Sequence, residues 1–345
     1  MNNASNVDRA ISVNYLLQPI EEWLRDDEIT EIAINRPCEV WIEKENQWKR
    51  FEVPELTFDH LNSMATSVAS YTDNNISFVS PILSATLPNG ERTQFVISPA
   101  CEDGCVSVTI RKPSFTNRTL QDYSEDGFFE HIHPVNNKIT PIEEELLTLK
   151  DTDIEAFLQT AVINEKNIVI AGGTGSGKTT FMKALMELIP RNQRIITIED
   201  VPELFLPNHK NSVHLFYPSE AMPEDPVTSA KLLKSCLRMK PDRIMLAELR
   251  GAETFDFINV NASGHGGSIT SCHANSAQMA FERLAMMAMQ NPQGRALPYE
   301  VIKTLLHQVI DIVVHITNDV HSNEPLGRHI TEIWYDPSKR NAHTG

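Results

Sequence analysis

The spacing of apolar residues near the N-terminus predicts a helix. Five apolar residues recur at intervals of three and four positions: Val13, Leu16, Leu17, Ile20 and Leu24. This period of about 3.6 residues is typical of an amphipathic helix. Its polar side carries four acids: Glu21, Glu22, Asp26 and Asp27. Acids on that side argue against a helix lying on a membrane surface, so we expect it to pack on its own domain.

Alternating patterns then predict strands and hairpins. Glu39–Glu43 and Gln47–Val53 flank a short polar stretch, and Ala85–Leu87 and Arg92–Ile97 flank Pro88-Asn89-Gly90. Asn-Gly is a strong hairpin signal because both residues tolerate positive φ. Together with a further strand over Val106–Ile110, these patterns predict an N-terminal α/β domain with an antiparallel sheet over residues 1–112.

The pattern changes twice more. Residues 113–150 carry Pro113, Pro134 and Pro141 among many acids, which indicates a linker with short helices. From residue 151 to 345, helical and strand patterns alternate, which predicts a mostly parallel sheet covered by helices. Helices are expected over Ile154–Ile163, Thr179–Ile189 and Val227–Leu237, and strands over Asn167–Ala171, Arg194–Ile198 and Arg243–Ala247.

A phosphate-binding loop joins the first of these strands to the helix that follows it. The segment from Gly172 to Thr179 fits G-x-x-x-x-G-K-[ST] at every position. Glycines let backbone N–H groups approach phosphate oxygens, and the helix N-terminus favours an anion. Lys178 should neutralise the β- and γ-phosphates, and the Thr179 hydroxyl should ligate Mg²⁺. The expected nucleotide-binding residues are Gly172, Gly173, Thr174, Gly175, Ser176, Gly177, Lys178, Thr179 and Thr180.

Acidic and histidine residues follow the neighbouring strands. Glu199, Asp200 and Glu203 come after the Arg194–Ile198 strand, and Glu248 ends the next one. Carboxyl ends of parallel strands meet at one edge of a sheet, where ligands bind. Hydrolysis needs carboxylates to position water and the metal shell. His265 and His273 stand in and after a glycine-rich turn, and could sense the γ-phosphate or serve as ordinary structural histidines.

The net charge and the cysteine content make three kinds of partner less expected: DNA, an anionic membrane and a structural zinc ion. The 30 basic and 46 acidic residues give a net charge of −16, which disfavours bulk binding to DNA or to an anionic membrane. The five cysteines have irregular spacing and no Cys-x-x-Cys pair, so a structural zinc site is not expected. With no apolar run near about 20 residues and no signal sequence, we expect a cytoplasmic protein.

The ordered motifs resemble the secretion ATPase superfamily, and most closely the traffic ATPases of bacterial type IV secretion systems. In that family the phosphate loop is followed by an Asp box, a Walker B segment and a His box. The corresponding segments here are Ile198–Asp200, Leu237–Arg250 and Gly264–His273. Upstream, Leu87–Arg92 and Thr109–Lys112 match the family's N-terminal domain. The likeness extends from about Ile29 to Ile316.

The resemblance implies a RecA-like ATPase domain, ATP and Mg²⁺ as cofactors, and a hexameric ring that hydrolyses ATP to drive pilus assembly and substrate translocation. It implies peripheral association with the inner membrane, contacts with other secretion components, and no sequence-specific nucleic-acid binding. Nucleotide would sit between the domains. The residue roles that it implies are phosphate contacts for Arg92 and Arg111, the water-orienting base for Glu199, the Mg²⁺ shell for Glu248, γ-phosphate sensing for His273, and subunit contacts for Arg238 and Arg250.

Other functions stay open from the sequence. A motor for type IV pili or type II secretion is the nearest alternative. A nucleotide-binding scaffold without turnover and a RecA-like helicase are more distant ones, and the net charge disfavours the helicase. The lack of a tetracysteine segment argues against the type II subclass. Any of Glu199, Asp200 and Glu203 could orient the attacking water.

Overall fold

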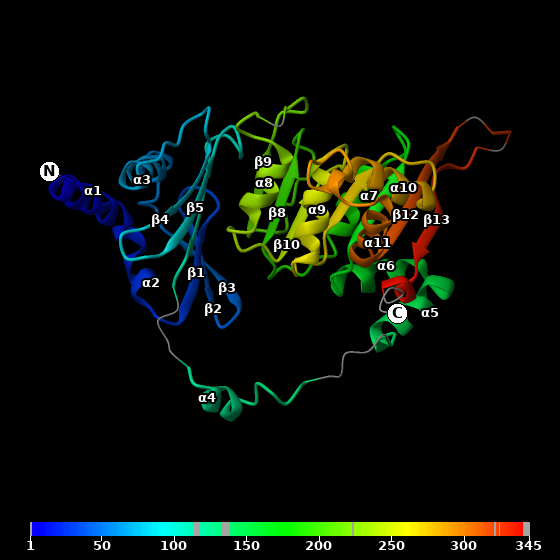
Figure 1. The fold of residues 1–345 in the computed structure, drawn as a ribbon, viewed down its shortest axis with the longest axis horizontal. Helices are drawn as coiled ribbons and strands as arrows, with labels where there is room; N and C mark the ends of the chain where they lie inside the picture. Colours follow the sequence, from blue (N-terminus) through cyan, green and yellow to red (C-terminus); the bar gives the residue numbers. More distant parts are fainter. Residues whose placement is uncertain are drawn as a thin grey trace.

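Two sheets organise the chain in a computed structural model that describes residues 2–113, 118–132, 138–222, 224–320, 322–323 and 325–340. Figure 1 shows an N-terminal and a C-terminal domain side by side, each built on one sheet. The first sheet is antiparallel and the second is mostly parallel, which confirms the predicted fold class. In the described part of the chain, no helix is both long enough and apolar enough to traverse a bilayer.

The N-terminal domain is a six-stranded sheet in the order β3-β2-β1-β6-β5-β4. Its strands are β1 (Ile29–Ile34), β2 (Glu39–Lys44), β3 (Gln47–Glu52), β4 (Ile82–Thr86), β5 (Arg92–Ile97) and β6 (Val106–Arg111). The helices α1 (Asn2–Leu17), α2 (Glu21–Arg25) and α3 (Phe58–Tyr71) lie on the side away from the other domain. Val13, Leu17 and Ile20 are buried in this domain's core with residues of α3, so the prediction that the first helix packs on its own domain is confirmed.

The C-terminal sheet has the order β13-β12-β7-β11-β10-β8-β9. Its strands are β7 (Ile168–Gly172), β8 (Ile195–Glu199), β9 (Ser212–Phe216), β10 (Arg243–Leu246), β11 (Ile269–Cys272), β12 (Ile312–Asp319) and β13 (Gly327–Tyr335). Every residue of β7 and β8 is buried, as expected for strands covered on both faces. The flanking helices are α6 (Ile154–Ile163), α7 (Lys178–Met186), α8 (Ser229–Cys236), α9 (Glu253–Ala262), α10 (Ala277–Ala288) and α11 (Tyr299–Val309).

Between the domains runs a long connection that contains α4 (Leu120–Glu125) and α5 (Pro141–Thr152). In the view of Figure 1, α4 lies below the two domains and α5 lies at the far end of the C-terminal domain. Leu146 of α5 is fully buried among C-terminal core residues, so the last part of the predicted linker packs on that domain. Parts of the predicted linker, including the proline at 134, lie outside the described residues.

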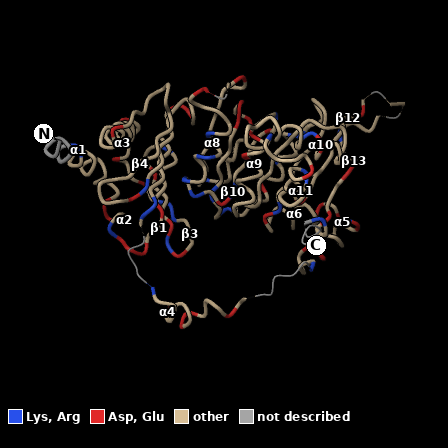
Figure 2. The backbone as a smooth tube through the Cα atoms, in the orientation of Figure 1, with Lys and Arg blue, Asp and Glu red and all other residues tan. Residues whose placement is uncertain are grey.

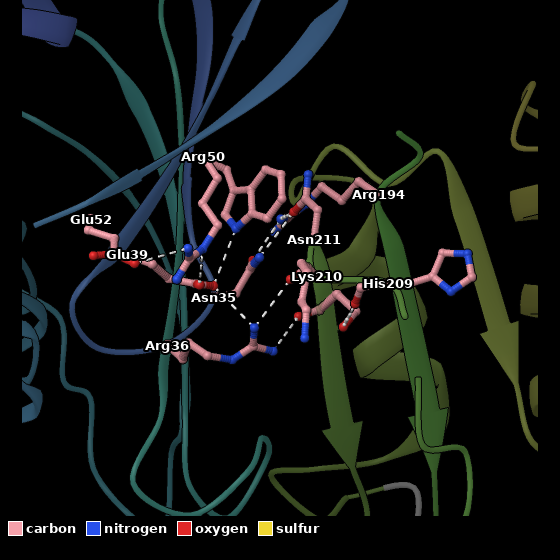
Figure 3. A network of polar contacts seen from close by, with 11 residues as sticks. Asn35, Arg36, Glu39, Arg50, Glu52, Arg194, His209, Lys210 and Asn211 are labelled. Carbon is pink, nitrogen blue, oxygen red and sulfur yellow. Dashed lines mark hydrogen bonds and ion pairs between the residues drawn. The ribbon is translucent and has the colours of Figure 1, made fainter. Parts of the chain in front are cut away.

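The domains meet along a polar junction centred on Arg194, at the start of β8 (Figure 3). Its side chain is fully buried. Nη1 donates to Oδ1 of Asn35 at 2.7 Å and of Asn211 at 2.6 Å, and Nε donates to the Met239 carbonyl at 2.9 Å. The guanidinium also lies 5.5 Å from the Trp48 ring. Arg194 therefore links the first β-sheet to the second through hydrogen bonds made inside the protein.

Further contacts surround this centre. Arg36 donates to the carbonyls of Lys210 and Ser212 at 3.2 and 3.3 Å, and Lys240 pairs with Glu43 at 2.7 Å. Figure 2 shows basic residues on both sides of the junction. Apolar contacts add to them, because Val96, Ala100 and Cys101 share a core cluster with residues of the second sheet. The junction is therefore a packed interface and not a loose hinge.

Candidate active site

The phosphate loop sits where β7 gives way to α7. Gly175 and Gly177 adopt φ of +74° and +95°, a region that L side chains disfavour, and Gly177 directly precedes the helix. The loop lines a cavity of about 310 Å³. This cavity brings together residues of the loop, the acidic segments and a distant hairpin, namely Gly173, Thr174, Gly175, Gly177, Lys178, Thr179, Thr180, Asp200, Val201, Glu203, Ala247, Glu248, Arg250, Ser271, His273 and Arg328.

Lys178 is held inside the loop. Its Nζ donates to the carbonyl oxygens of Gly172 and Gly173, each at 3.0 Å. Burial lowers the pKa of this ammonium, and the nearby Glu248 carboxylate opposes the shift. The side chain is 9% exposed, so the charge is compensated here by backbone dipoles and is positioned beside the space that an anion would occupy.

Gly172 is required by close packing at the base of the loop. A Cβ at this position would lie 2.4 Å from the Ile316 carbonyl oxygen and 2.7 Å from Ser176 Oγ. At the neighbouring Gly173, a Cβ would meet nothing within 4 Å. A methyl side chain would therefore clash at position 172 but would fit without a clash at position 173.

We predict that Gly172→Ala lowers the free energy of unfolding by about 1–3 kcal/mol, because β12 or the loop must shift to admit the methyl group. Gly173→Ala is the matched control and should change it by less than about 0.5 kcal/mol. Urea unfolding without nucleotide measures both. Equal stability of the two variants would show that the approach of β12 to the loop is not tight.

Across the cavity, acidic groups surround Arg250. Its Nε lies 2.9 Å from Glu248 Oε2, and its Nη1 donates to Asp200. Glu248 Oε1 is 2.9 Å from Nε2 of His273, yet it accepts no hydrogen bond of good geometry although it is buried. Glu248, His273 and Arg250 thus line the same cavity, although the sequence analysis expected Arg250 at a subunit contact.

Glu199 lies elsewhere. Its carboxylate is 1% exposed and accepts the backbone N–H groups of Glu203 and Leu204 at 2.8 and 2.7 Å, and the Thr197 hydroxyl at 2.6 Å. Burial would raise the pKa of Glu199, but hydrogen bonds, that of His214 first, hold it below its usual value. Glu199 does not line the phosphate-loop cavity, whereas Asp200 and Glu203 do.

The two predicted N-terminal arginines also lie apart from the loop. Arg92 and Arg111 are paired across β5 and β6 and, with Thr93, Leu237 and Arg238, they line a cavity of about 130 Å³ at the junction. This volume is below the roughly 300 Å³ typical of small-molecule sites. Within one chain, the structure therefore gathers three arginines but does not bring them to the phosphate loop. His265 does not line the loop cavity either.

Two residues that the sequence analysis did not single out reach the loop from the β12–β13 hairpin. Arg328 Nε donates to the Gly175 carbonyl at 3.2 Å, and Asn318 Nδ2 donates to the same oxygen at 3.5 Å. They are directly opposite each other in the hairpin register. About 150 residues separate them from the loop, so no local pattern could have pointed to them.

The residues present fit a magnesium-bound nucleotide. Thr179 supplies a hydroxyl, Glu248 supplies an unbonded carboxylate oxygen, and the loop supplies an ammonium group at a helix N-terminus. Hydroxyl, carboxylate and water oxygens are the ligands that Mg²⁺ prefers. Within the described ranges, no group of three or more His, Cys, Asp or Glu side chains is placed to hold a metal by itself.

Comparisons with known proteins show what the whole chain is similar to. A family model described as "Type II/IV secretion system protein" matches residues 15–323. The type IV secretion system protein VirB11 of Brucella abortus is 60% identical over 339 residues, which cover 97% of this chain and 93% of that protein. PtlH of Bordetella pertussis, also a type IV secretion system protein, is 44% identical over 337 residues, covering 97% and 98%. The crystal structure of the VirB11 ATPase from Brucella suis, in complex with sulphate, superposes with a TM-score of 0.91 at 59% identity, covering 96% of this chain and 99% of that one.

Proposed function

The chain belongs to the Type II/IV secretion system protein family, and from this premise we propose that it is an ATP-hydrolysing motor of a bacterial type IV secretion system. Relatives at 44–60% identity over nearly their full length are type IV secretion proteins, and a similar solved structure is an ATPase. These likenesses favour type IV secretion over the alternatives of a type IV pilus motor and a type II secretion motor.

The observation that carries this proposal is the composition of the loop cavity. Most residues of the phosphate loop, among them Lys178 and Thr179, line a single space together with Glu248. Lys178 and the N-terminus of α7 supply positive charge for the β- and γ-phosphates. When bound, Mg²⁺ would supply positive charge that offsets the negative charge developing on the transferred phosphate. Thr179 would ligate it, and Glu248 would hold its water shell.

The carboxylates divide the remaining roles. Glu203 lines the cavity, and we assign it to orienting the attacking water. Glu199 acts as a positioning residue. Its carboxylate accepts the backbone N–H of Glu203 at 2.8 Å and so holds Glu203 in place in the segment that follows β8. His273 lies against Glu248 and would respond to the γ-phosphate through it. This assignment moves the base from Glu199 to a group that faces the substrate.

A ring of subunits would explain why two arginines of the N-terminal domain lie far from the phosphate loop of their own chain. Arg92 and Arg111 lie on the N-terminal domain, away from their own phosphate loop. Arg92 has no ion-pair partner among the described residues, and Arg111 lies 3.4 Å from Glu31. In a homo-hexamer, they would contact the phosphates of a neighbouring subunit, for which the planar guanidinium is well suited. The ring would work at the cytoplasmic face of the inner membrane with other secretion components.

Phosphate release from ATP tests the proposal. The purified chain should release phosphate only with Mg²⁺, and EDTA should abolish the release because it removes the cation that offsets the negative charge of the phosphates. Specific activity should rise with protein concentration as rings assemble, in step with gel filtration in the presence of ATP. Phosphate release that persists in excess EDTA, or complete absence of hydrolysis by the assembled protein, would contradict the proposal.

A further inference from the structure

We propose that Arg328 is a second phosphate-binding cation of the nucleotide site, supplied by the β12–β13 hairpin. This inference rests on the proposed function and adds to it a residue outside the phosphate-loop motif. It concerns the α- and β-phosphates, so it applies to ADP as well as ATP.

The pairing of β12 with β7 and β13 places the Arg328 side chain at the phosphate loop. β12 runs parallel to β7, with Ile316 opposite Gly172, so its continuation extends beyond the carboxyl end of β7 and over the loop. Asn318 and Arg328 form a directly opposed pair in that extension. Both donate to the Gly175 carbonyl, which fixes the hairpin at the tip of the loop.

The aliphatic stem of Arg328 is fixed as well. Its Cδ would lie 3.2 Å from a Cβ built on Gly177, so the stem packs over a glycine that has no room for a side chain on that side. Nε is engaged by the Gly175 carbonyl. The two terminal nitrogens make no hydrogen bond or ion pair with any described residue, and the side chain lines the loop cavity.

No acid that lines the cavity forms an ion pair with Arg328. Asp200 and Glu248 are both paired with Arg250, and the third acid, Glu203, makes no ion pair with any described residue. Backbone N–H groups in this part of a phosphate loop cradle the α- and β-phosphates. A guanidinium anchored at Gly175 and Gly177 therefore stands beside those phosphates, and its fork geometry matches a pair of phosphate oxygens.

Three variants separate charge from packing. Arg328→Met keeps a stem over Gly177 and removes the charge, Arg328→Lys keeps a positive charge, and Arg328→Ala removes both. We expect Arg328→Met and Arg328→Ala to weaken ADP and ATP binding alike, by about tenfold or more, as measured by calorimetric titration of the full chain with Mg²⁺. Arg328→Lys should recover most of the affinity. Thermal unfolding without nucleotide should not differ between Arg328→Met and the parent chain.

The outcomes are distinguishable. If Arg328→Met binds ADP and ATP as tightly as the parent while Lys178→Ala loses binding, the phosphate loop functions and Arg328 is only structural, which overturns this inference. The same holds if only Arg328→Ala is weakened, because packing then explains the effect. If the parent chain binds no nucleotide, the proposed function fails first and this inference fails with it.

Discussion

Replacing Lys178 by alanine is expected to weaken ATP binding by at least about a hundredfold and to abolish phosphate release. The side chain is the one ammonium group within the loop, and it is already oriented by the Gly172 and Gly173 carbonyls at 3.0 Å. Hydrogen bonds from a charged donor contribute about 1.5–3 kcal/mol each, and Lys178 should make more than one to the β- and γ-phosphates. Calorimetric titration and a phosphate-release assay measure the two losses.

Lys183 provides the matched control. It lies on the same helix, α7, and does not line the loop cavity. Lys183→Ala should bind ATP within about twofold of the parent chain, since its charge acts only through solvent. If Lys178→Ala retains the parent's turnover, the loop is not the catalytic phosphate site, and the enzyme assignment is wrong.

The second large effect is expected at the domain junction. Arg194→Ala should lower the free energy of unfolding by about 3–5 kcal/mol, because it removes a fully buried side chain and the hydrogen bonds that it donates. Asn35, Asn211 and the Met239 carbonyl would lose their shared partner. Burial already lowers the pKa of Arg194 to about 10, yet the group remains charged at neutral pH.

Urea unfolding measures this loss, and Arg283→Ala is its control. Arg283, on α10, is exposed, and its side chain makes no hydrogen bond or ion pair with any other described residue, so its removal should change stability by no more than about 0.5 kcal/mol. Arg194→Met, which keeps most of the volume, should fall between the two. If Arg194→Ala were as stable as Arg283→Ala, the junction would contribute little to folding.

Local patterns predicted much of the fold. Helical spacing predicted the first helix, and Asn89-Gly90 predicted the β4–β5 hairpin, because side-chain periodicity and turn geometry depend on residues close in sequence. The loop motif is also local, so its strand, glycines and helix could all be placed. The bounds differed slightly at α7, which ends at Met186 and not at Ile189.

The direction of the acids could not be predicted. Successive residues at a strand end point to opposite sides, so neighbouring Glu199 and Asp200 cannot both face the nucleotide. The sequence does not show which one finds backbone N–H donors. The structure gives those donors to Glu199 through the turn at Glu203 and Leu204, a contact that depends on how the loop folds back.

Contacts between segments that are distant in the sequence could not be predicted for a different reason. Arg194 is indistinguishable from a surface arginine until Asn35, 159 residues away, is placed beside it. Arg328 reaches the loop only because β12 pairs with β7 and β13 pairs with β12. Strand order across a sheet is set by long-range packing, so a single sequence cannot assign these residues to a site.

A crystal structure of the chain with Mg²⁺ and a non-hydrolysable ATP analogue tests the central claim most directly. We predict the β- and γ-phosphates within the turn from Gly172 to Thr180, with Lys178 Nζ moved from the Gly172 and Gly173 carbonyls onto phosphate oxygens. A nucleotide bound elsewhere, or a turn that keeps Lys178 on its own carbonyls at saturating analogue, would contradict the account.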